Sequence, residues 1–517
     1  MLAVVSSSIL ALVLAVTIHA PAQPPAAPPT PGAPAPPAAS PSTAPPFDGP
    51  ETPVVTKHEL RAGGKTLRYT ATTGFLPIRN AQGEIDARMF FIAYTLDGVA
   101  DPASRPLTVS FNGGPGSSSV WLHLGALGPK RVAMNDDGTM PAPPYRLIDN
   151  EATWLDQTDL VFVDPVGTGY SRPSKADQGS RFWGVQGDIQ SVGEFIRLYV
   201  TRYGRWTSPL FMVGESYGTT RAAGLAGHLI DRGIAFNGIL LVSSILNFQT
   251  ARFTVGNDLP YVLFLPTYTA TAFHHKKLAP DLQRDLAATL KEAEAWASGE
   301  YTTALARGSA LTGPARVAIA DKLARYTGLS RDYVERANLR IEIQRFCKEL
   351  LRAEGRTVGR LDSRFVGVDR SGVADEPDFD PSLAAIRPPY TAALNDLVRR
   401  TLGFQSDVPY HILGGGIGTW DWGSAGSGFT DTGDALRDAF AKNPHMRVFV
   451  GSGYFDLATP YFATEYTLDH LGLPGDLAAR ITRRYYRAGH MMYIDVNELA
   501  GLRKDVAAFI AEALKGR

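Results

Sequence analysis

The chain has almost no cysteine, since Cys347 is the only one among 517 residues. A single thiol cannot form an intrachain disulfide, so the fold must be stabilised by its core alone. Cys347 lies in the segment IQRFCKELLRAEG, which is typical of a helix. This setting favours a buried structural thiol over a reactive nucleophile.

The sequence also lacks an excess of either charge, because 51 Lys and Arg residues balance 51 Asp and Glu residues. That balance, without any long run of like charge, argues against a nucleic-acid-binding surface. No His-Glu-x-x-His motif or cluster of metal ligands is present, so we expect neither a metal nor another cofactor. Apolar residues make up 44% of the chain, which is enough for one large domain with an insertion.

Long hydrophobic runs are scarce as well. Residues 1–20 are apolar, uncharged and end in small residues, which indicates a signal peptide. The basic residue that usually precedes such a run is missing, so an uncleaved N-terminal anchor is the alternative. Residues 21–54 are rich in Pro and Ala and predict an extended spacer, whose role stays open. We expect a periplasmic or secreted protein with no further membrane span.

Beyond the spacer, short apolar runs typical of buried strands alternate with helical patterns. This alternation predicts an α/β fold with a mostly parallel central sheet flanked by helices. Residues 251–405 are instead rich in helical patterns, which predicts a helical cap inserted between two parts of the core, residues 55–250 and 406–517. The predicted strands are LTVSFN (107–112), LVFVD (160–164), LFMVG (210–214), GILLVS (238–243), MRVFVG (446–451) and RRYYRAG (483–489).

The motif Gly-x-Ser-x-Gly occurs at residues 214–218, directly after a predicted strand and before a predicted helix. Its glycines permit a sharp strand-to-helix turn that lifts the hydroxyl of Ser216 off the end of the sheet. The helix N-terminus would also favour a developing negative charge. The motif alone is weak, and an ordinary Gly-rich turn is the alternative, but its position between strand and helix predicts a nucleophile.

The other predicted catalytic groups follow further strands. The Gly-Gly pair after residues 107–112 suits a loop that donates an oxyanion N–H from Gly114, with Tyr217 supplying the second N–H. Asp456 follows the strand MRVFVG, and His490 follows RRYYRAG. In an α/β-hydrolase the chain order is nucleophile, acid and then base, so these positions predict a triad of Ser216, Asp456 and His490.

Together these motifs resemble the serine carboxypeptidases, a branch of the α/β-hydrolases, and look closest to bacterial members. The resemblance runs from about residue 55 onward. It implies that Asn112 and Glu215 recognise the free C-terminal carboxylate of a peptide substrate, with Glu215 protonated. The matching blocks are FNGGPGSSS (111–119), DPVGTGYS (164–171), GESYG (214–218), GYFDLATP (453–460) and AGHMMY (488–493).

The sequence departs from the family pattern where the carboxylate-binding network is expected. Ser110 stands in place of a Trp, Ser117 in place of a Cys, and no Glu lies near Ala126. We therefore expect a serine carboxypeptidase, with a broader serine esterase or acyltransferase as the alternative. A non-catalytic binding protein is the third hypothesis, although every position of the triad is occupied. The preferred C-terminal residue and the oligomeric state cannot be read from the sequence.

Overall fold

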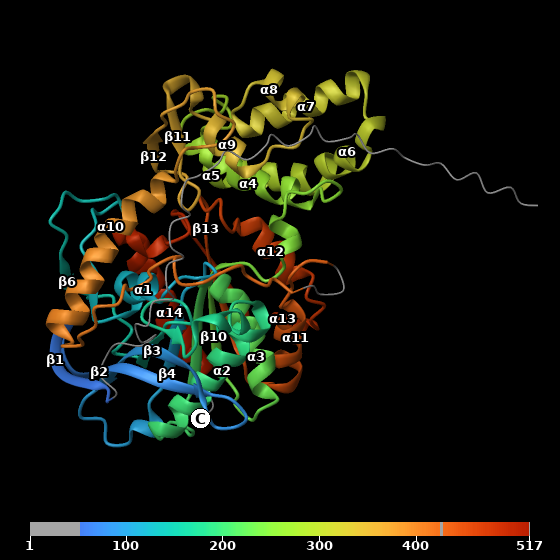
Figure 1. The fold of residues 1–517 in the computed structure, drawn as a ribbon. Coiled ribbons are helices and arrows are strands. Elements are labelled where there is room, and N and C mark those ends of the chain that lie inside the picture. Colours follow the sequence, from blue (N-terminus) through green and yellow to red (C-terminus); the bar gives the residue numbers. More distant parts are fainter. Residues whose placement is uncertain (1–51, 424–427, 516–517) are drawn as a thin grey trace, which may run out of the picture. The chain divides into compact units, whose positions relative to one another are not determined.

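The computed structural model describes residues 52–423 and 428–515, and one ten-stranded sheet runs through them (Figure 1). Along the order β1-β2-β3-β7-β4-β9-β10-β13-β14, pairing is antiparallel as far as β7 and parallel from there on. The short β8 (Arg172–Pro173) pairs with β3. The other strands are β1 (Val54–Ala62), β2 (Lys65–Arg79), β3 (Ile85–Leu96), β4 (Leu107–Phe111), β7 (Asp159–Val163), β9 (Leu210–Ser216), β10 (Gly238–Ser244), β13 (Arg447–Gly453) and β14 (Ile481–Tyr486).

The parallel strands coincide with the predicted apolar runs, and the α/β fold is confirmed. They read as apolar runs because they are covered on both faces: every residue of β4 and β7 is buried. Strands β1 to β3 were not predicted. In the first part of β2 the buried Leu67, Tyr69 and Ala71 alternate with exposed or partly exposed Thr and Arg residues, because one face of that part lies toward solvent.

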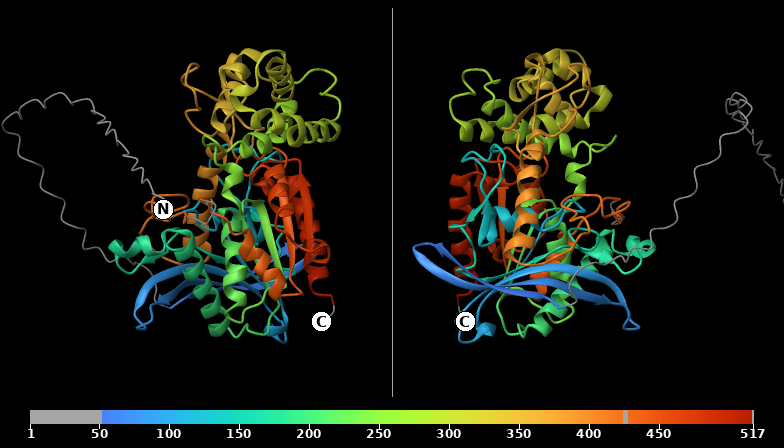
Figure 2. Two further views of the ribbon diagram at one scale, coloured as in Figure 1. Left: turned by 90° about the vertical axis from the view of Figure 1, so that its right-hand side faces the viewer. Right: turned by 60° about the vertical axis from the view of Figure 1, so that its left-hand side comes forward.

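Helices cover the two faces of the sheet and form two separate cores (Figure 2). Alternate residues of β10 point to opposite cores: Leu240 and Val242 contribute to one, and Ile239 and Leu241 to the other. The first core includes α14 (Val496–Ala513). The second includes α2 (Val185–Arg202), α3 (Tyr217–Ile230) and α11 (Gly433–Lys442).

Residues 251–405, here called the inserted helical region, contribute no strand to the large sheet. Figures 1 and 2 show its helices α4 to α9 gathered beyond one end of the strands. They share a hydrophobic cluster in which Cys347 of α9 is buried, and Leu457 and Ala463 also contribute to it. The elements are α4 (Leu259–His274), α5 (Leu286–Trp296), α6 (Thr302–Ala306), α7 (Gly313–Thr327), α8 (Arg331–Arg336), α9 (Ile343–Glu349), the hairpin β11 (Arg356–Val358) and β12 (Val366–Val368), and α10 (Pro381–Asp396).

The predicted signal segment, residues 1–20, lies outside the described residues. Of the predicted spacer, residues 21–54, the structure describes only the last three, and Val54 already begins β1. Within residues 52–423 and 428–515, no helix combines the length and apolar character needed to cross a bilayer.

Candidate active site

Ser216 is the last residue of β9, and α3 begins at Tyr217. Its backbone has φ 59° and ψ −131°, a conformation that side-chain-bearing residues rarely adopt and that is held here by the surrounding turn. The turn leaves no room for a side chain at Gly214, because a Cβ there would lie 2.1 Å from the carbonyl oxygen of Gly218. The sharp turn predicted from the sequence is therefore present, and it holds Ser216 in a strained conformation.

Asp456 and His490 meet behind this turn, on the loops that follow β13 and β14. The Nδ1 atom of His490 lies 2.7 Å from Oδ2 of Asp456, and both side chains are buried. The other carboxylate oxygen accepts the backbone N–H groups of Ala458 and Thr459 at 2.8 and 3.0 Å. Burial acts to lower the pKa of His490, but the adjacent charge of Asp456 outweighs it and raises that pKa. The carboxylate therefore both orients the imidazole and favours its protonated form.

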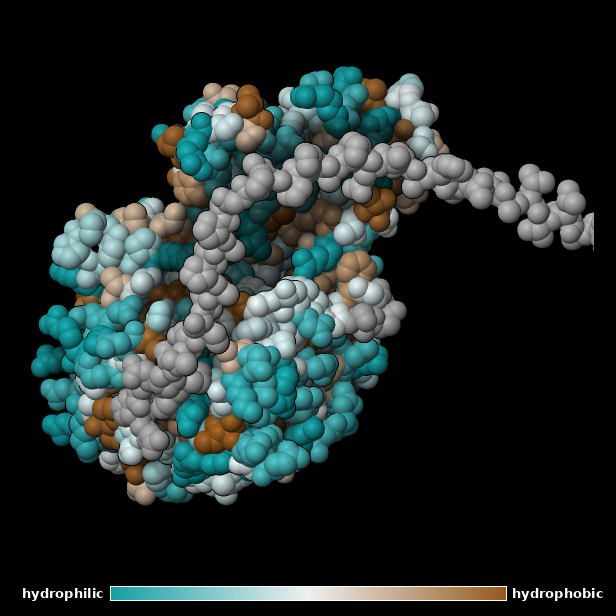
Figure 3. Space-filling view, viewed as in Figure 1, coloured by the Kyte–Doolittle hydropathy of each residue, from teal (hydrophilic) through white to brown (hydrophobic). Residues whose placement is uncertain are grey.

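Ser216 and His490 line one pocket of about 150 Å³, together with Gly113 and Gly114. The remaining walls come largely from apolar side chains, among them Trp121 and several residues of the inserted helical region. Figure 3 shows a recess between that region and the body of the sheet, with hydrophobic side chains in its wall. The three predicted catalytic residues are thus brought together at one pocket, and their roles stay predictions.

The loop after β4 packs directly against the start of α3. A Cβ on Gly113 would lie 2.4 Å from the amide nitrogen of Tyr217, so the two backbones touch at this point. Gly114 has φ +100°, a conformation that glycine adopts without strain, and it lines the pocket. Backbone N–H groups from this loop and from Tyr217 can therefore converge on one oxygen atom. The assignment of Gly114 and Tyr217 as oxyanion donors stays a prediction.

The predicted carboxylate-binding residues contact each other. Asn112 donates from Nδ2 to Oε1 of Glu215 at 3.0 Å, and the hydroxyl of Tyr493 donates to Oε2. The backbone N–H of Leu122 holds the other end of the Asn112 amide at 3.1 Å. Burial raises the pKa of Glu215 to about 7, despite the opposing effect of His490. Glu215 therefore changes its charge near neutral pH and is protonated below it.

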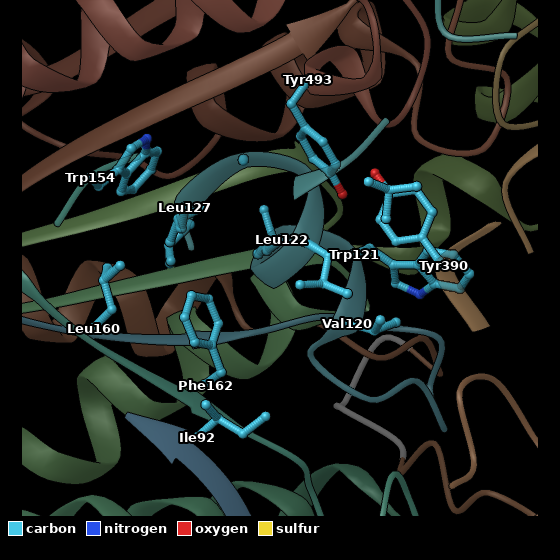
Figure 4. Packing of buried hydrophobic residues seen from close by; sticks show 14 of the residues in the cluster. Ile92, Val120, Trp121, Leu122, Leu127, Trp154, Leu160, Phe162, Tyr390 and Tyr493 are labelled. Atoms are coloured by element: carbon cyan, nitrogen blue, oxygen red, sulfur yellow. The ribbon is translucent and has the colours of Figure 1, made fainter. Parts of the chain in front are cut away.

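The sequence analysis did not predict a role for Tyr493, although this residue ends the block AGHMMY that contains His490. Figure 4 shows it beside Tyr390, with the two hydroxyl ends close together. A Cβ on Gly125 would meet the ring of Tyr493 at 2.4 Å and the hydroxyl of Tyr390 at 2.7 Å. Two tyrosines therefore fill the space next to Ala126, where the resemblance leads one to expect a Glu, and one of them bonds to Glu215.

Ser117, which stands in place of the family Cys, accepts a hydrogen bond from a tryptophan side chain. The indole N–H of Trp121 donates to the Ser117 hydroxyl at 2.8 Å, and Trp121 lines the pocket. Ser110, at the position of the family Trp, is fully buried within β4. A tryptophan ring thus borders the pocket, but from the start of α1 (Val120–Leu122) instead of from the strand.

A buried arginine braces the loop beneath these groups. Arg221 donates to the carbonyl oxygen of Asn112 at 2.7 Å and pairs with Asp188 at 2.8 Å. Its guanidinium also lies over the rings of Phe111 and Tyr217, at 5.1 and 5.3 Å from their centres. Because Arg221 is buried and lies in α3, these contacts tie the loop after β4 to the helix that follows Ser216.

Residues 360–362 of the inserted helical region bond to the loop after β13, which carries Asp456, and to the loop after β14, which carries His490. The carbonyl oxygen of Arg360 accepts the N–H of Leu457, and that of Leu361 accepts the N–H of His490, at 3.1 and 2.6 Å. Asp362 accepts the N–H of Gly489 at 3.0 Å. No local pattern in the sequence marks this segment, because its role depends on contacts about 100 residues away in the chain.

Within the described residues, no group of three His, Cys, Asp or Glu side chains is arranged to hold a metal ion. The chemistry available at this pocket is that of a buried imidazole and carboxylate beside a serine hydroxyl and backbone N–H groups. Such a set can transfer an acyl group through a covalent intermediate.

Comparison with known proteins finds that the chain is similar to serine carboxypeptidases. Residues 63–294 match the family model described as serine carboxypeptidase. The pheromone-processing carboxypeptidase KEX1 of Saccharomyces cerevisiae is 32% identical over 158 residues, which are 28% of this chain and 20% of that protein. Serine carboxypeptidase-like 9 of Arabidopsis thaliana is 23% identical over 237 residues, 44% of this chain and 51% of that protein. The chain thus matches only a fifth to a half of these relatives' lengths.

The fold has a counterpart over a longer stretch. The crystal structure of Kex1(delta)p, a prohormone-processing carboxypeptidase from Saccharomyces cerevisiae, superimposes with a TM-score of 0.53 over 86% of this chain and 91% of that one. Identity is 17%, so this match speaks for the α/β-hydrolase fold alone. The match through residues 63–294 spans slightly less than half of the chain, so it shows similarity to the serine carboxypeptidase family over that part.

Proposed function

We propose that this protein is a serine carboxypeptidase that hydrolyses the C-terminal peptide bond of peptides. The observation that carries the proposal is the 2.7 Å hydrogen bond between His490 and Asp456 at the pocket that Ser216 also lines. A buried imidazole–carboxylate pair next to a serine in a strained strand-to-helix turn is the arrangement that activates a hydroxyl for acyl transfer.

In the proposed mechanism Ser216 attacks the carbonyl carbon of the last peptide bond, and His490 takes its proton. The N–H groups of Gly114 and Tyr217 stabilise the oxyanion of the tetrahedral intermediate. His490 then gives the proton to the leaving amino group, and the terminal amino acid departs. Water, activated by His490, hydrolyses the acyl-enzyme and frees Ser216.

Asn112 and Glu215 give this mechanism its preference for a C-terminal carboxylate. An ionised Glu215 would repel that carboxylate, whereas the protonated form can donate a hydrogen bond to it. The pKa of about 7 keeps Glu215 protonated in acidic and weakly acidic solution. Substrate binding should therefore be tighter there than at alkaline pH.

The organisation of the chain fits an exported hydrolase. In this proposal residues 55–250 and 406–517 form the catalytic core and residues 251–405 a cap that shapes the substrate pocket. The pocket lining supports this division, because Leu361, Leu383 and Ile386 all come from the inserted helical region. Residues 1–20 would direct export to the periplasm or medium, and residues 21–54 would act as the spacer.

The experiment is release of the terminal amino acid from a blocked dipeptide between about pH 4 and about pH 8, beside its C-terminal amide. We expect release from the free acid, much weaker action on the amide, and a loss of at least about 10⁴-fold in kcat in Ser216→Ala. Ser298→Ala, an exposed serine in the inserted helical region, is the matched control.

Two outcomes would change the proposal. Equal action on acid and amide, still dependent on Ser216, would indicate the broader esterase or acyltransferase. Absence of both hydrolysis and fluorophosphonate labelling at Ser216 would indicate a binding protein.

A further inference from the structure

Arg360 brings a positive charge to the catalytic pocket. Among the described residues lining that pocket it is the only Lys or Arg. Its backbone is fixed on both sides, since its carbonyl oxygen accepts the N–H of Leu457 and its own N–H donates to Asp380 at 3.1 Å. The side chain therefore starts from a rigid point next to the loop that carries Asp456.

The guanidinium of Arg360 has unused donors. Among the described residues, Arg360 makes hydrogen bonds only through its backbone. No carboxylate oxygen of those residues lies within 4.0 Å of its guanidinium nitrogens. Glu376, which lines an adjacent pocket together with Arg360, makes no ion pair with it either. A half-buried guanidinium with free N–H groups is a site for an anion, above all for a carboxylate.

The two carboxyl groups that line the pocket, those of Asp380 and Glu215, do not pair with the guanidinium of Arg360. Asp380 accepts the N–H groups of Arg360, Leu361 and Ser382, and it forms the N-cap of α10, where the helix dipole offsets its charge. Glu215 is protonated below about pH 7, when it adds no negative charge. The positive charge of Arg360 also acts on His490, which places it within electrostatic reach of the triad.

The walls around Arg360 suit an aliphatic stem that ends in a charge. Trp121, Leu361, Leu383, Ile386 and Leu413 line the same pocket. Apolar walls bury methylene groups, and a single unpaired cation then fixes the charged end. The side chains of glutamate and aspartate have this composition.

We propose that Arg360 is a specificity residue that binds a second carboxylate in the substrate, the side chain of a C-terminal Glu or Asp. The inference rests on the proposed carboxypeptidase function and names its substrate class. Asn112 and Glu215 bind the main-chain carboxylate in that function, so Arg360 is left to bind the side chain. A site with a half-buried, otherwise unpaired charge discriminates against an analogue that lacks the matching group.

The test compares two blocked dipeptides that end in Glu and Gln, because they differ only in the charge of the side chain. We expect wild type to prefer Glu in kcat/KM, and Arg360→Gln to reduce this ratio by about 10- to 100-fold, the loss of a charge-assisted hydrogen bond. Arg356→Gln, an exposed arginine on the neighbouring β11, is the matched control and should keep the wild-type ratio.

Each failure has its own signature. Hydrolysis without preference for Glu in wild type would overturn the role of Arg360 and leave the carboxypeptidase intact. An equal loss on both dipeptides in Arg360→Gln would mean that Arg360 binds the main-chain carboxylate or positions the loop. If no dipeptide is cleaved, protection of Ser216 from a fluorophosphonate by the same two dipeptides still measures the preference, and equal protection would overturn the proposal.

Discussion

The carboxyl end of the sheet and the inserted helical region both line the pocket, but they supply different kinds of groups. The sheet end supplies Ser216 and His490 and the glycines of the oxyanion loop. The inserted helical region supplies Arg360, Asp380 and apolar side chains. The predicted reactive groups thus lie at strand ends, and the inserted helical region adds a further part of the wall.

The strands that end at the pocket and the inserted helical region are packed in different ways. The strands that end at the pocket are buried on both faces, so their last residues have little freedom, as the positive φ of Ser216 requires. The inserted helices share a hydrophobic cluster in which Phe346 and Tyr326 are fully buried, and Leu457, next to Asp456, also contributes to it. The part of this region that lines the pocket packs differently, since Ile386 belongs to the first sheet core and Leu361 and Leu383 pack against it.

The largest effect should come from the sheet side. Asp456→Asn keeps the shape of the carboxyl group but removes the charge that orients and stabilises the His490 imidazolium. We expect kcat to fall by about 10⁴-fold, since the imidazole is then held in the wrong tautomer. The measurement is kcat on a blocked dipeptide, with thermal unfolding as a check of folding.

Asp469→Asn serves as the control for this substitution. Asp469 is exposed and pairs with Arg483 at 2.5 Å. A surface ion pair contributes little, so kcat should stay within about twofold of wild type. A loss of less than about tenfold in a folded Asp456→Asn protein would contradict the triad and remove the contrast between the two regions.

Substitution of a glycine in each region tests the same contrast between the sheet end and the inserted helical region, with a smaller expected loss of kcat. An added methyl at Gly113 would lie 2.4 Å from the amide of Tyr217 and 2.7 Å from the carbonyl of Glu215. Because both are backbone atoms, the oxyanion loop must move away from Ser216. We expect Gly113→Ala to lower kcat by about 10²- to 10³-fold, as when an oxyanion donor is lost.

Gly299→Ala, in the inserted helical region, is the counterpart. Gly299 lies in the helical turn Ala297–Tyr301, and no atom lies within 4 Å of an added Cβ. Activity should be unchanged, and helix propensity predicts a slight gain in stability. Wild-type activity in a folded Gly113→Ala protein would contradict the close contact between the oxyanion loop and Tyr217.

The sheet end could be predicted from the sequence because its signals are local. Each parallel strand is a short apolar run, and the glycines at residues 214 and 218 mark the turn around Ser216 by their own steric need. Asp456 and His490 follow their strands within a few residues. Chain order and strand ends were therefore sufficient to bring the three residues to one place.

The remaining contacts could not be predicted in this way. Tyr493 bonds to Glu215 across 278 residues of the chain, and Arg360 reaches the pocket because the connection between β11 and β12 packs on the loop after β13. Such contacts follow from tertiary packing and leave no periodic pattern in the sequence. The antiparallel strand β2 was a different case, since its alternation of buried and exposed positions was present but was not recognised.

The smallest expected effect concerns Glu215, which in the proposed function binds the substrate carboxylate and does not react. Burial raises the pKa of Glu215 to about 7, so its protonated form dominates below that pH and its ionised form above it. If only the protonated form accepts a carboxylate, KM for a free-acid dipeptide should rise about tenfold between about pH 6 and about pH 8. The KM of the corresponding amide should stay flat over that range.

Glu215→Gln separates this effect from the titration of His490. Glutamine keeps the size of the side chain and can accept from Asn112, but it carries no charge at any pH. We expect KM for the free acid to become independent of pH in this variant. In both proteins kcat should still fall as the pH drops through the raised pKa of His490, because the base must be neutral. A flat KM in wild type would show that the charge of Glu215 does not affect binding of the substrate carboxylate.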